Sequence, residues 1–342
     1  MPPTESPRRR PTIADVARRA GVSAAAVSFA VNDRPGVSPE TRERILVVAR
    51  ELGWRPSASA RALTEARTRA IGLVLARNAE QLELDAFFVR FLAGIERALT
   101  EADYALLLQL VPGGASAALP AYERLAAAGR VDGFLLTDVE LDDPRFALLE
   151  AAGVPVVLAG RPTGACPFVW VETRHEEGMR GPVEHLAGLG HERIAFFGGR
   201  AEFEHVQARA ERWREAIEAA GVEEGPAVHA DDSEAAAAAD VLLSAEPTAI
   251  VCASDVLALA VVVAARARGL DVPGDVSVTG FDDSPLAALA SPGLTSVRVD
   301  YGGFGEAVAG TLLAAIGVGE APDFQPSAPE LVVRASTAAP RR

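Results

Sequence analysis

The stretch TIADVARRAGVSAAAVSFAV, residues 12–31, decides how the amino-terminal part of the chain folds. Its apolar residues recur at helical spacing, first as Ile13, Val16, Ala17 and Ala20 and then as Ala26, Val27, Ala30 and Val31. Each group marks one face of an amphipathic helix. Only Gly21-Val22 separates the first group from Ser23, which opens the second helix. Two helices joined so tightly must cross sharply, so the stretch predicts a helix-turn-helix.

A third apolar stripe follows, formed by Ile45, Val48, Ala49 and Leu52, with the i, i+3, i+4, i+7 spacing of a helix. Ser38 provides a side chain that can cap the start of this helix, and Pro39 suits its first turn. Gly53 can end the helix, because glycine readily takes the left-handed conformation found there. We therefore expect an all-α headpiece over residues 12–55, preceded by a disordered basic tail over residues 1–11.

The second helix has a face opposite its core stripe that core packing does not account for. Its residues are Ala24, Ala25, Ser28, Phe29 and Asn32. The leading candidate for the partner of this face is a DNA major groove, which the second helix of such a motif enters. Ser28 and Asn32 can form hydrogen bonds, while Phe29 and the alanines can contact thymine methyl groups. Packing of Phe29 inside the headpiece is the alternative for that residue.

Charge is distributed unevenly along the chain. The 342 residues have a formal net charge of -14, but residues 1–69 contain 13 Arg and 7 acidic residues and carry +6. The remaining residues therefore carry -20. A small basic module joined to a large acidic body favours DNA binding that is confined to one end of the chain.

From Ala70 onward, short apolar strands alternate with amphipathic helices. The expected strands are 71–75, 105–111, 132–136, 154–158, 194–197, 249–253 and 276–280, and the expected helices are 87–99, 122–128, 144–152, 176–189, 208–219, 233–243 and 255–268. Continuous apolar strands between helices imply parallel sheets covered on both faces, which is a doubly wound α/β architecture. Two such series predict two similar lobes with a cleft between them.

Composition and missing motifs narrow the class of protein. Apolar content of 49% excludes wholesale disorder, and no apolar run reaches the ~18 residues of a membrane span, so no membrane partner is expected. An amino terminus without an apolar signal-peptide core, and two cysteines, Cys166 and Cys252, suit a cytoplasmic protein. The sequence lacks the motifs of metal, nucleotide and hydrolase sites, so we expect no catalytic residues, no metal and no cofactor. An enzyme or a transport-type solute binder on the same core is the alternative.

Several segments, in order and at the right spacing, resemble the LacI/GalR family of bacterial transcription regulators. They are Thr12–Ala17, Gly21–Ser23, Val27-Ser28, Asn32, Val37-Ser38 and Thr41-Arg42 in the headpiece, and Leu189–Phe196, Val272–Asp283, Pro292–Val297 and Val333–Thr337 in the core. The resemblance implies a periplasmic-binding-protein-like core, over residues 70–340, that binds a small-molecule effector between its lobes. It also implies a homodimer, or a higher oligomer, whose headpieces read a palindromic double-stranded DNA operator.

The resemblance also assigns the parts of the chain. It implies an N-lobe of about residues 70–172 plus 300–328 and a C-lobe of about residues 173–299 plus 329–340. It further implies a hinge helix and linker over residues 56–69, with Leu63 pushed as a wedge between base steps of the minor groove. A capping contact on the core is the alternative for Leu63. Repression is expected, because a dimer bound over a promoter blocks polymerase.

The predicted DNA contacts combine the exposed face of the second helix with its flanks and the hinge. The set is Thr12, Ser23, Ala24, Ala25, Ser28, Phe29, Asn32, Arg34, Arg55, Ser57, Ala60, Arg61 and Leu63. Ser23 suits a phosphate at a helix amino end, and the arginines suit phosphates or else are solvated surface residues. Many family members carry hydrogen-bonding side chains where this chain has Ala24, Ala25 and Phe29. We therefore expect apolar base discrimination that depends strongly on DNA deformability.

The predicted effector residues lie mostly after strands of the core. They are Phe87, Phe88, Arg161, Arg209, Ser254, Asp255 and Asp282. By the resemblance, Arg209 falls on an effector-binding arginine and Asp282 on an effector-binding acid, and the planar fork of Arg209 suits sugar hydroxyls or a carboxylate. Core packing is the alternative for Phe87 and Phe88, and helix capping is the alternative for Asp255. Gly160-Arg161 and Thr173-Arg174 depart from sugar-binding members, so a sugar or an anionic metabolite is expected as effector.

Overall fold

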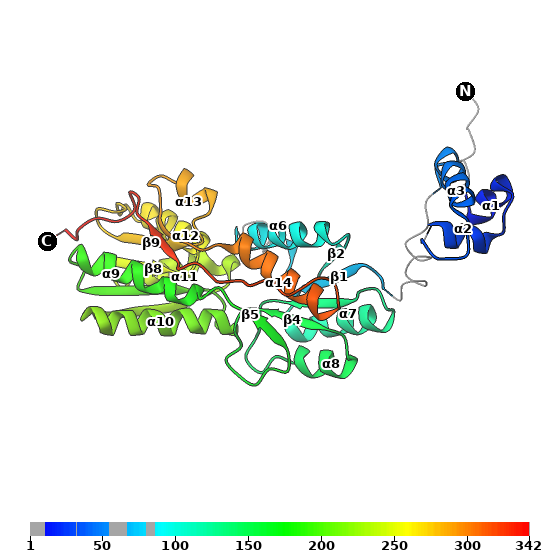
Figure 1. Ribbon diagram of the computed structural model, residues 1–342. Coiled ribbons are helices and arrows are strands. Elements are labelled where there is room, and N and C mark those ends of the chain that lie inside the picture. Colours follow the sequence, from blue (N-terminus) through cyan, green and yellow to red (C-terminus); the bar gives the residue numbers. More distant parts are fainter. Residues whose placement is uncertain (1–10, 32, 55–66, 80–85, 342) are drawn as a thin grey trace, which may run out of the picture. The chain divides into compact units, whose positions relative to one another are not determined.

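The computed structural model describes residues 11–31, 33–54, 67–79 and 86–341, and the chain divides into two compact units between Thr68 and Arg69. In the first unit, the described residues form helices α1 (Ile13–Ala20), α2 (Ala24–Val31) and α3 (Pro39–Glu51) (Figure 1). These helices confirm the predicted helix-turn-helix and its third helix. Val16, Val27 and Ile45, one from each helix, are fully buried against one another.

Local side chains fix where the headpiece helices begin and end. Thr12 and Asp15 form a reciprocal capping box at the start of α1, and Gly21 ends that helix with φ 68°. Ser38 caps α3 by accepting a hydrogen bond from the Thr41 N–H. Such caps stabilise a short helix by about 1 kcal/mol each, which matters in a domain with so small a core.

The second unit contains two sheets. The first is five-stranded with the order β2-β1-β3-β4-β5, and all of its strand pairs are parallel. Its strands are β1 (Ala70–Leu75), β2 (Ala105–Leu110), β3 (Gly133–Leu136), β4 (Val156–Ala159) and β5 (Val169–Val171), and the helices between them are α6 (Ala86–Glu101), α7 (Ala115–Ala127) and α8 (Arg145–Ala152). Adjacent residues of β1 serve opposite faces, since Leu73 and Val74 are both fully buried but join different core clusters. Helices therefore cover both faces of this sheet, as the sequence predicts.

The second sheet is six-stranded with the order β11-β10-β9-β8-β6-β7, and all pairs are parallel except β10 with β11. Its strands are β6 (Arg193–Gly198), β7 (Glu223–His229), β8 (Ala249–Cys252), β9 (Ser277–Phe281), β10 (Thr295–Arg298) and β11 (Glu330–Val332). The α-helices from α9 onward are α9 (Arg180–Gly188), α10 (Glu204–Ala220), α11 (Ala235–Leu243), α12 (Asp255–Ala267), α13 (Pro285–Leu289) and α14 (Tyr301–Ala315), and short 3-10 turns cover His175–Met179 and Asp232–Glu234. Figure 1 shows helices on both sides of this sheet as well.

Helix α14 follows the second sheet in sequence but packs against α6 and β4 of the first. Glycines allow α6 and α14 to cross closely: a methyl group on Gly94 would overlap the carbonyl oxygen of Gly302, and one on Gly305 would overlap that of Phe91. None of the helices in the described part of the chain combines the length and apolar character needed to span a bilayer.

The α6–α14 crossing makes a prediction about stability. Gly94→Ala should destabilise the core by about 1–3 kcal/mol, because the added methyl group forces two helix backbones apart. Differential scanning calorimetry of the full chain should show a lower melting temperature for the core. Gly188→Ala is the matched control, since a methyl group there meets no atom within 4 Å in a helix. Equal melting temperatures for the two variants would contradict the close crossing.

Candidate functional site

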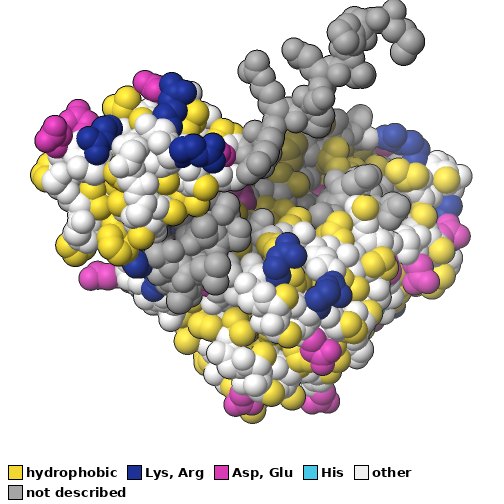
Figure 2. All heavy atoms as spheres, turned by 90° about the vertical axis from the view of Figure 1, so that its right-hand side faces the viewer, with side chains coloured by type: hydrophobic (Ala, Val, Ile, Leu, Met, Phe, Trp, Pro, Cys, Tyr) yellow, Lys and Arg dark blue, Asp and Glu magenta, His cyan; other side chains and the backbone are white. Residues whose placement is uncertain are grey.

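The exposed face of α2 is the first candidate surface. Ala24, Ala25 and Phe29 are exposed and Ser28 is half-buried, whereas Val27 on the opposite face is fully buried. Phe29 is 38% exposed, so it lies outside the headpiece core. Exposed apolar side chains are common on the face drawn in Figure 2, where they lie among basic and acidic ones. The position of Phe29 on the helix, and not its exposure alone, therefore makes it a candidate.

The structure places the other predicted DNA contacts as follows. Thr12 and Ser23 serve as helix caps, with Ser23 Oγ accepting from the Ala26 N–H at 3.1 Å, and Arg34 is exposed. The Arg42 guanidinium fixes the turn before α3 by donating to the carbonyl oxygens of Ala30 (3.0 Å) and Arg34 (2.7 Å). Asn32, Arg55, Ser57, Ala60, Arg61 and Leu63 lie outside the described residues.

A cavity in the second unit is lined where strands of both sheets end. Parallel strands place their carboxyl ends at one edge of a sheet, and ligands of open α/β sheets bind there. From the first sheet the lining includes Arg77 after β1, Thr137 and Asp138 after β3, and Gly160 after β4. From the second sheet it includes Arg200 after β6, Asp232 after β7, Ser254 and Asp255 after β8, and Asp282 after β9. Phe87, His205, Arg209 and Tyr301 add side chains from helices.

Arg209 is held rigidly inside this cavity. Its Nη1 donates to the carbonyl oxygen of Ala253 at 2.7 Å, and its Nη2 donates to the Tyr301 hydroxyl at 3.3 Å. The guanidinium also lies 4.0 Å from the centre of the Phe281 ring. Its Nε–H is buried without a hydrogen-bond partner. Because buried donors are almost always satisfied, this group is available to a bound molecule.

Asp282 faces Arg209 from the end of β9. Its Oδ1 accepts a hydrogen bond from the Tyr301 hydroxyl at 2.8 Å. Burial raises the pKa of Asp282 to about 6, and the nearby Asp255 charge adds to this, although Arg209 and Tyr301 oppose it. Arg90 of α6 donates to the backbone carbonyl oxygens of Asp282 (3.0 Å) and Asp283 (2.7 Å). A helix of the first sheet thus holds the loop that presents Asp282.

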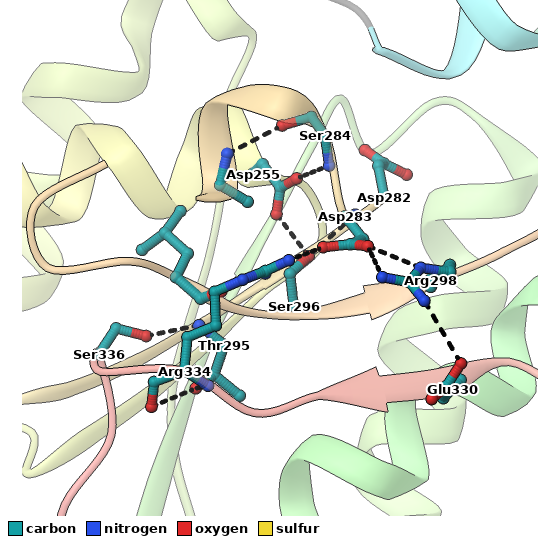
Figure 3. Close-up of polar contacts among 12 residues, drawn as sticks. Asp255, Asp282, Asp283, Ser284, Thr295, Ser296, Arg298, Glu330, Arg334 and Ser336 are labelled. Atoms are coloured by element: carbon teal, nitrogen blue, oxygen red, sulfur yellow. Dashed lines mark hydrogen bonds and ion pairs between the residues drawn. The ribbon is translucent and has the colours of Figure 1, made fainter. Parts of the chain in front are cut away.

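The neighbouring acids serve a different purpose, which Figure 3 shows. The Asp283 carboxylate accepts hydrogen bonds from Arg298 and Arg334. Asp255 accepts from the Ser284 N–H at 2.7 Å and the Ser296 hydroxyl at 2.6 Å. The Asp282 side chain points away from this network (Figure 3). Both Asp255 oxygens are therefore engaged in holding the loop, and it is Ser254 that caps α12 by accepting from the Leu257 N–H.

Of the two predicted phenylalanines, one lines the cavity and the other does not, and the predicted Arg161 does not line it either. Phe87 lines the cavity and packs edge-on against the Tyr301 ring, with centroids 4.8 Å apart. Phe88 is fully buried and does not line it, so core packing is its role. Consecutive helical residues point about 100° apart, so both rings cannot face the same space. Arg161 is exposed and is not among the lining residues.

Several lining residues were not predicted from the sequence. Arg77 and Asp138 form a bidentate pair, with Nε–Oδ2 at 2.7 Å and Nη2–Oδ1 at 3.0 Å. Burial opposes ionisation of Asp138, but the Arg77 guanidinium holds its pKa below the ordinary value. Burial and the positive charge of Arg209 lower the pKa of His205 to about 3, so its imidazole is neutral at pH 7. Because Arg77 and Asp138 follow strands, the strand-end rule applied throughout would have found them.

Comparisons with known proteins agree with this arrangement. Residues 12–57 match a model described as "Bacterial regulatory proteins, lacI family", and residues 183–337 match a "Periplasmic binding protein-like domain". The regulator reg1 of Streptomyces lividans is 37% identical over 342 residues, covering 95% of this chain and 96% of that protein. The regulator CelR of Thermobifida fusca is 37% identical over 302 residues, covering 85% of this chain and 87% of that protein.

Solved structures give the same result. The Lac repressor dimer bound to operator and an anti-inducer matches with a TM-score of 0.81 and 28% identity, covering 97% of this chain and 100% of that one. A complex of CelR with cellobiose matches with a TM-score of 0.71 and 33% identity, covering 96% and 100%. The chain therefore belongs to the LacI family of bacterial transcriptional regulators, and it is not an enzyme.

The two adjacent acids make opposite predictions for stability. Asp282→Asn should raise the free energy of unfolding at pH 7.5 by up to about 3 kcal/mol, because it removes a carboxylate whose folded-state pKa is raised. This penalty is fully present above pH 6 and disappears toward pH 4, so the gain should disappear there too. Core melting temperatures between pH 4 and 7.5 would measure it.

Asp283→Asn is the matched control. Although burial opposes its ionisation, the Arg334 and Arg298 guanidiniums hold the pKa of Asp283 below its ordinary value. Its stabilising contribution is present above the unfolded-state pKa and is lost as the pH falls through the folded-state pKa. This variant should therefore be less stable than the parent protein at pH 7.5. The same sign of change for both variants would contradict the different roles of the two carboxylates.

Proposed function

We propose that the protein is a transcriptional repressor that binds a palindromic operator as a homodimer and is controlled by a carbohydrate effector in the cavity. Such a regulator works in the compartment that holds the chromosome, which in a bacterium is the cytoplasm. The observation that carries the proposal is the presence, in one chain, of a helix-turn-helix with an exposed α2 face and a cavity in which Arg209 keeps an unpartnered donor opposite Asp282.

The chemistry of the cavity supports a neutral polyhydroxyl ligand over an anionic one. A sugar hydroxyl both donates and accepts, so one hydroxyl can accept from Arg209 Nε–H while another donates to the Asp282 carboxylate. The lining holds five aspartates, Asp138, Asp231, Asp232, Asp255 and Asp282, against three arginines, Arg77, Arg200 and Arg209. An anion would therefore meet excess negative charge. The complex of the relative CelR with cellobiose supports the same ligand class.

DNase footprinting at the promoter of the protein's own gene tests the proposal. We expect one protected, two-fold symmetric site, and we expect its occupancy to change when a sugar that raises the protein's melting temperature is added. A promoter fusion should be more active when the gene is deleted. A fusion that loses activity on deletion would contradict repression, and an unprotected promoter together with no protected site in a genomic fragment pool would contradict DNA binding.

The exposed α2 face makes a prediction about base recognition. Phe29→Ala should change the operator preference in a binding-site selection, because apolar contact with thymine methyl groups is lost. Affinity for the parent operator should fall by about 1–3 kcal/mol, as for a mismatched base pair. Val47→Ala is the matched control, since Val47 is similarly exposed, at 40%, but lies on α3. An unchanged preference for Phe29→Ala would contradict apolar readout.

Exposed leucines on α13 support the proposed dimer. Leu289 is 81% exposed and Leu286 is 43% exposed, and Val89 on α6 is 65% exposed. Arg90 links the start of α6 to the Asp282–Asp283 loop immediately before α13, so these apolar side chains lie on neighbouring elements. Exposed apolar side chains that gather on neighbouring elements are typical of association surfaces, and on this ground we assign α13 to the dimer interface.

Leu289→Arg should convert the dimer to a monomer, because it places a charge in an apolar interface. Light scattering coupled to size exclusion would give the mass, and the operator footprint should weaken in parallel. Val241→Arg on α11 is the control, since Val241 is also highly exposed, at 65%. A Leu289→Arg variant that stays dimeric would exclude α13 from the interface.

A further inference from the structure

One end of the cavity holds polar groups that make no hydrogen bond with Arg209 or Asp282. Four adjacent strands of the second sheet end at the cavity in the order β9, β8, β6 and β7. Asp282 follows β9 and Asp232 lies after β7, so they mark opposite ends. Neighbouring strands are ~4.8 Å apart, so three spacings separate these ends by roughly 14 Å.

Two groups of the lining, the Thr137 hydroxyl and the Asp232 carboxylate, lack hydrogen-bond partners. Thr137 directly precedes Asp138, and the Asp138 partner Arg77 acts on the charge of Asp232 at the β7 end. The Thr137 side chain lines the cavity and is only 2% exposed, yet its hydroxyl makes no hydrogen bond. Asp232 is half-buried, and its carboxylate makes no hydrogen bond or ion pair with any described residue. Burial raises the pKa of Asp232, and the neighbouring Asp231 adds to this while Arg77 opposes it. A buried hydroxyl such as that of Thr137 is costly to leave unpartnered unless a bound molecule satisfies it.

The surroundings of these two groups include an ion pair whose charges cancel, and aromatic rings. Arg77 and Asp138 neutralise each other in their bidentate pair. The Arg77 guanidinium also lies 4.9 Å from the Phe88 ring centre and 5.7 Å from that of Phe203. His205, which is neutral at pH 7, lies one helical turn before Arg209 on α10 and stacks on Phe203, with ring centroids 5.4 Å apart. The Phe203 ring in turn lies 5.7 Å from the Arg77 guanidinium. It therefore lies between the two ends of the cavity.

We propose that Thr137 and Asp232 form a second sugar subsite, so that the effector is an oligosaccharide of at least two rings, one of them held by Arg209 and Asp282. This proposal rests on the proposed carbohydrate effector and extends it to ligand length. One sugar ring cannot contact both ends of a cavity of this span. A second ring, joined to the first in a linear oligosaccharide, places hydroxyls at the far end. There a hydroxyl accepts from or donates to Thr137 Oγ1, and another donates to Asp232.

The test compares each disaccharide with its own monosaccharides on the full-length protein. Melting temperatures and calorimetric affinities would be measured for cellobiose and maltose against glucose, for lactose against glucose and galactose, and for xylobiose against xylose. We expect at least one disaccharide to bind ten or more times as tightly as its component sugars. Monosaccharides that bind as tightly as every disaccharide would overturn the second subsite.

Two variants assign the subsite to its residues. Thr137→Val, which keeps shape but removes the hydroxyl, and Asp232→Asn should each weaken the preferred disaccharide by about three- to tenfold, the worth of one hydrogen bond. Both should leave monosaccharide affinity unchanged. The unliganded Thr137→Val protein should melt no lower than the parent, because its hydroxyl has no partner to lose. A purely structural role would lower that melting temperature and weaken all sugars alike, and this would overturn the proposal.

Asp282→Asn is the matched control at the other end, and it should weaken monosaccharides and disaccharides equally. If none of these sugars raises the melting temperature or binds in the calorimeter, the carbohydrate effector itself is wrong. That result differs from the failure of the second subsite alone, in which sugars bind without regard to length.

Discussion

The conformation of two consecutive aspartates governs the geometry of the cavity. Asp282 and Asp283 both have positive φ angles, 97° and 45°. A residue other than glycine is strained there and persists only when its surroundings hold it. The strain is met from three sides, by Arg90 on the two carbonyl oxygens, by Asp255 on the Ser284 N–H, and by Arg298 and Arg334 on the Asp283 carboxylate. The result is one carboxylate directed toward the cavity and one directed into an ion-pair network.

This arrangement divides stability and function between adjacent residues. Asp283, paired with two arginines, favours the folded state at neutral pH, while Asp282, buried and only partly compensated, opposes it. Arg209 shows the same division within one side chain, because two of its nitrogens are used for positioning and Nε is left without a partner. A ligand gains affinity by forming hydrogen bonds with the polar groups that are unsatisfied in the free protein.

The sequence predicts the elements better than it predicts the site. The stripes around Val16, Val27 and Ile45 locate all three headpiece helices, because each face is fixed by local spacing. Four strands, β5, β7, β10 and β11, were not expected from the sequence. EEGPAVH in β7 is polar and broken by Gly and Pro, and β5, β10 and β11 have only three or four residues each. Arg209 and Asp282 were identified by resemblance. For Phe88 the alternative of core packing holds, because this side chain is fully buried and only Phe87 lines the cavity.

The contacts of Arg77, Thr137 and Asp232 depend on which strand ends of two sheets face one another, and no local pattern encodes that. Arg77 and Asp232 are more than 150 positions apart in the sequence, yet each carries charge that acts on the other. The crossing of α14 back to the first sheet, with Gly94 and Gly305 at its contact, and the hydrogen bonds of Arg90 and Glu204 hold the two sheets together. A site built across two sheets is therefore a tertiary property even when each member follows a strand.

The same cross-sheet contacts couple the cavity to α6. Arg90 binds the backbone of Asp282, whose side chain lines the cavity, and the Glu204 N–H donates to the Val139 carbonyl oxygen across the two sheets. A molecule that contacts both sheets stabilises this arrangement relative to any other by the difference in its binding energies. The coupling is reciprocal: if operator DNA prefers one arrangement of the sheets, it changes effector affinity by the same factor by which effector changes DNA affinity. Arg90 donates to backbone carbonyl oxygens and does not line the cavity. Its hydrogen bonds therefore affect how the sheets are held together and not which ligand the cavity selects.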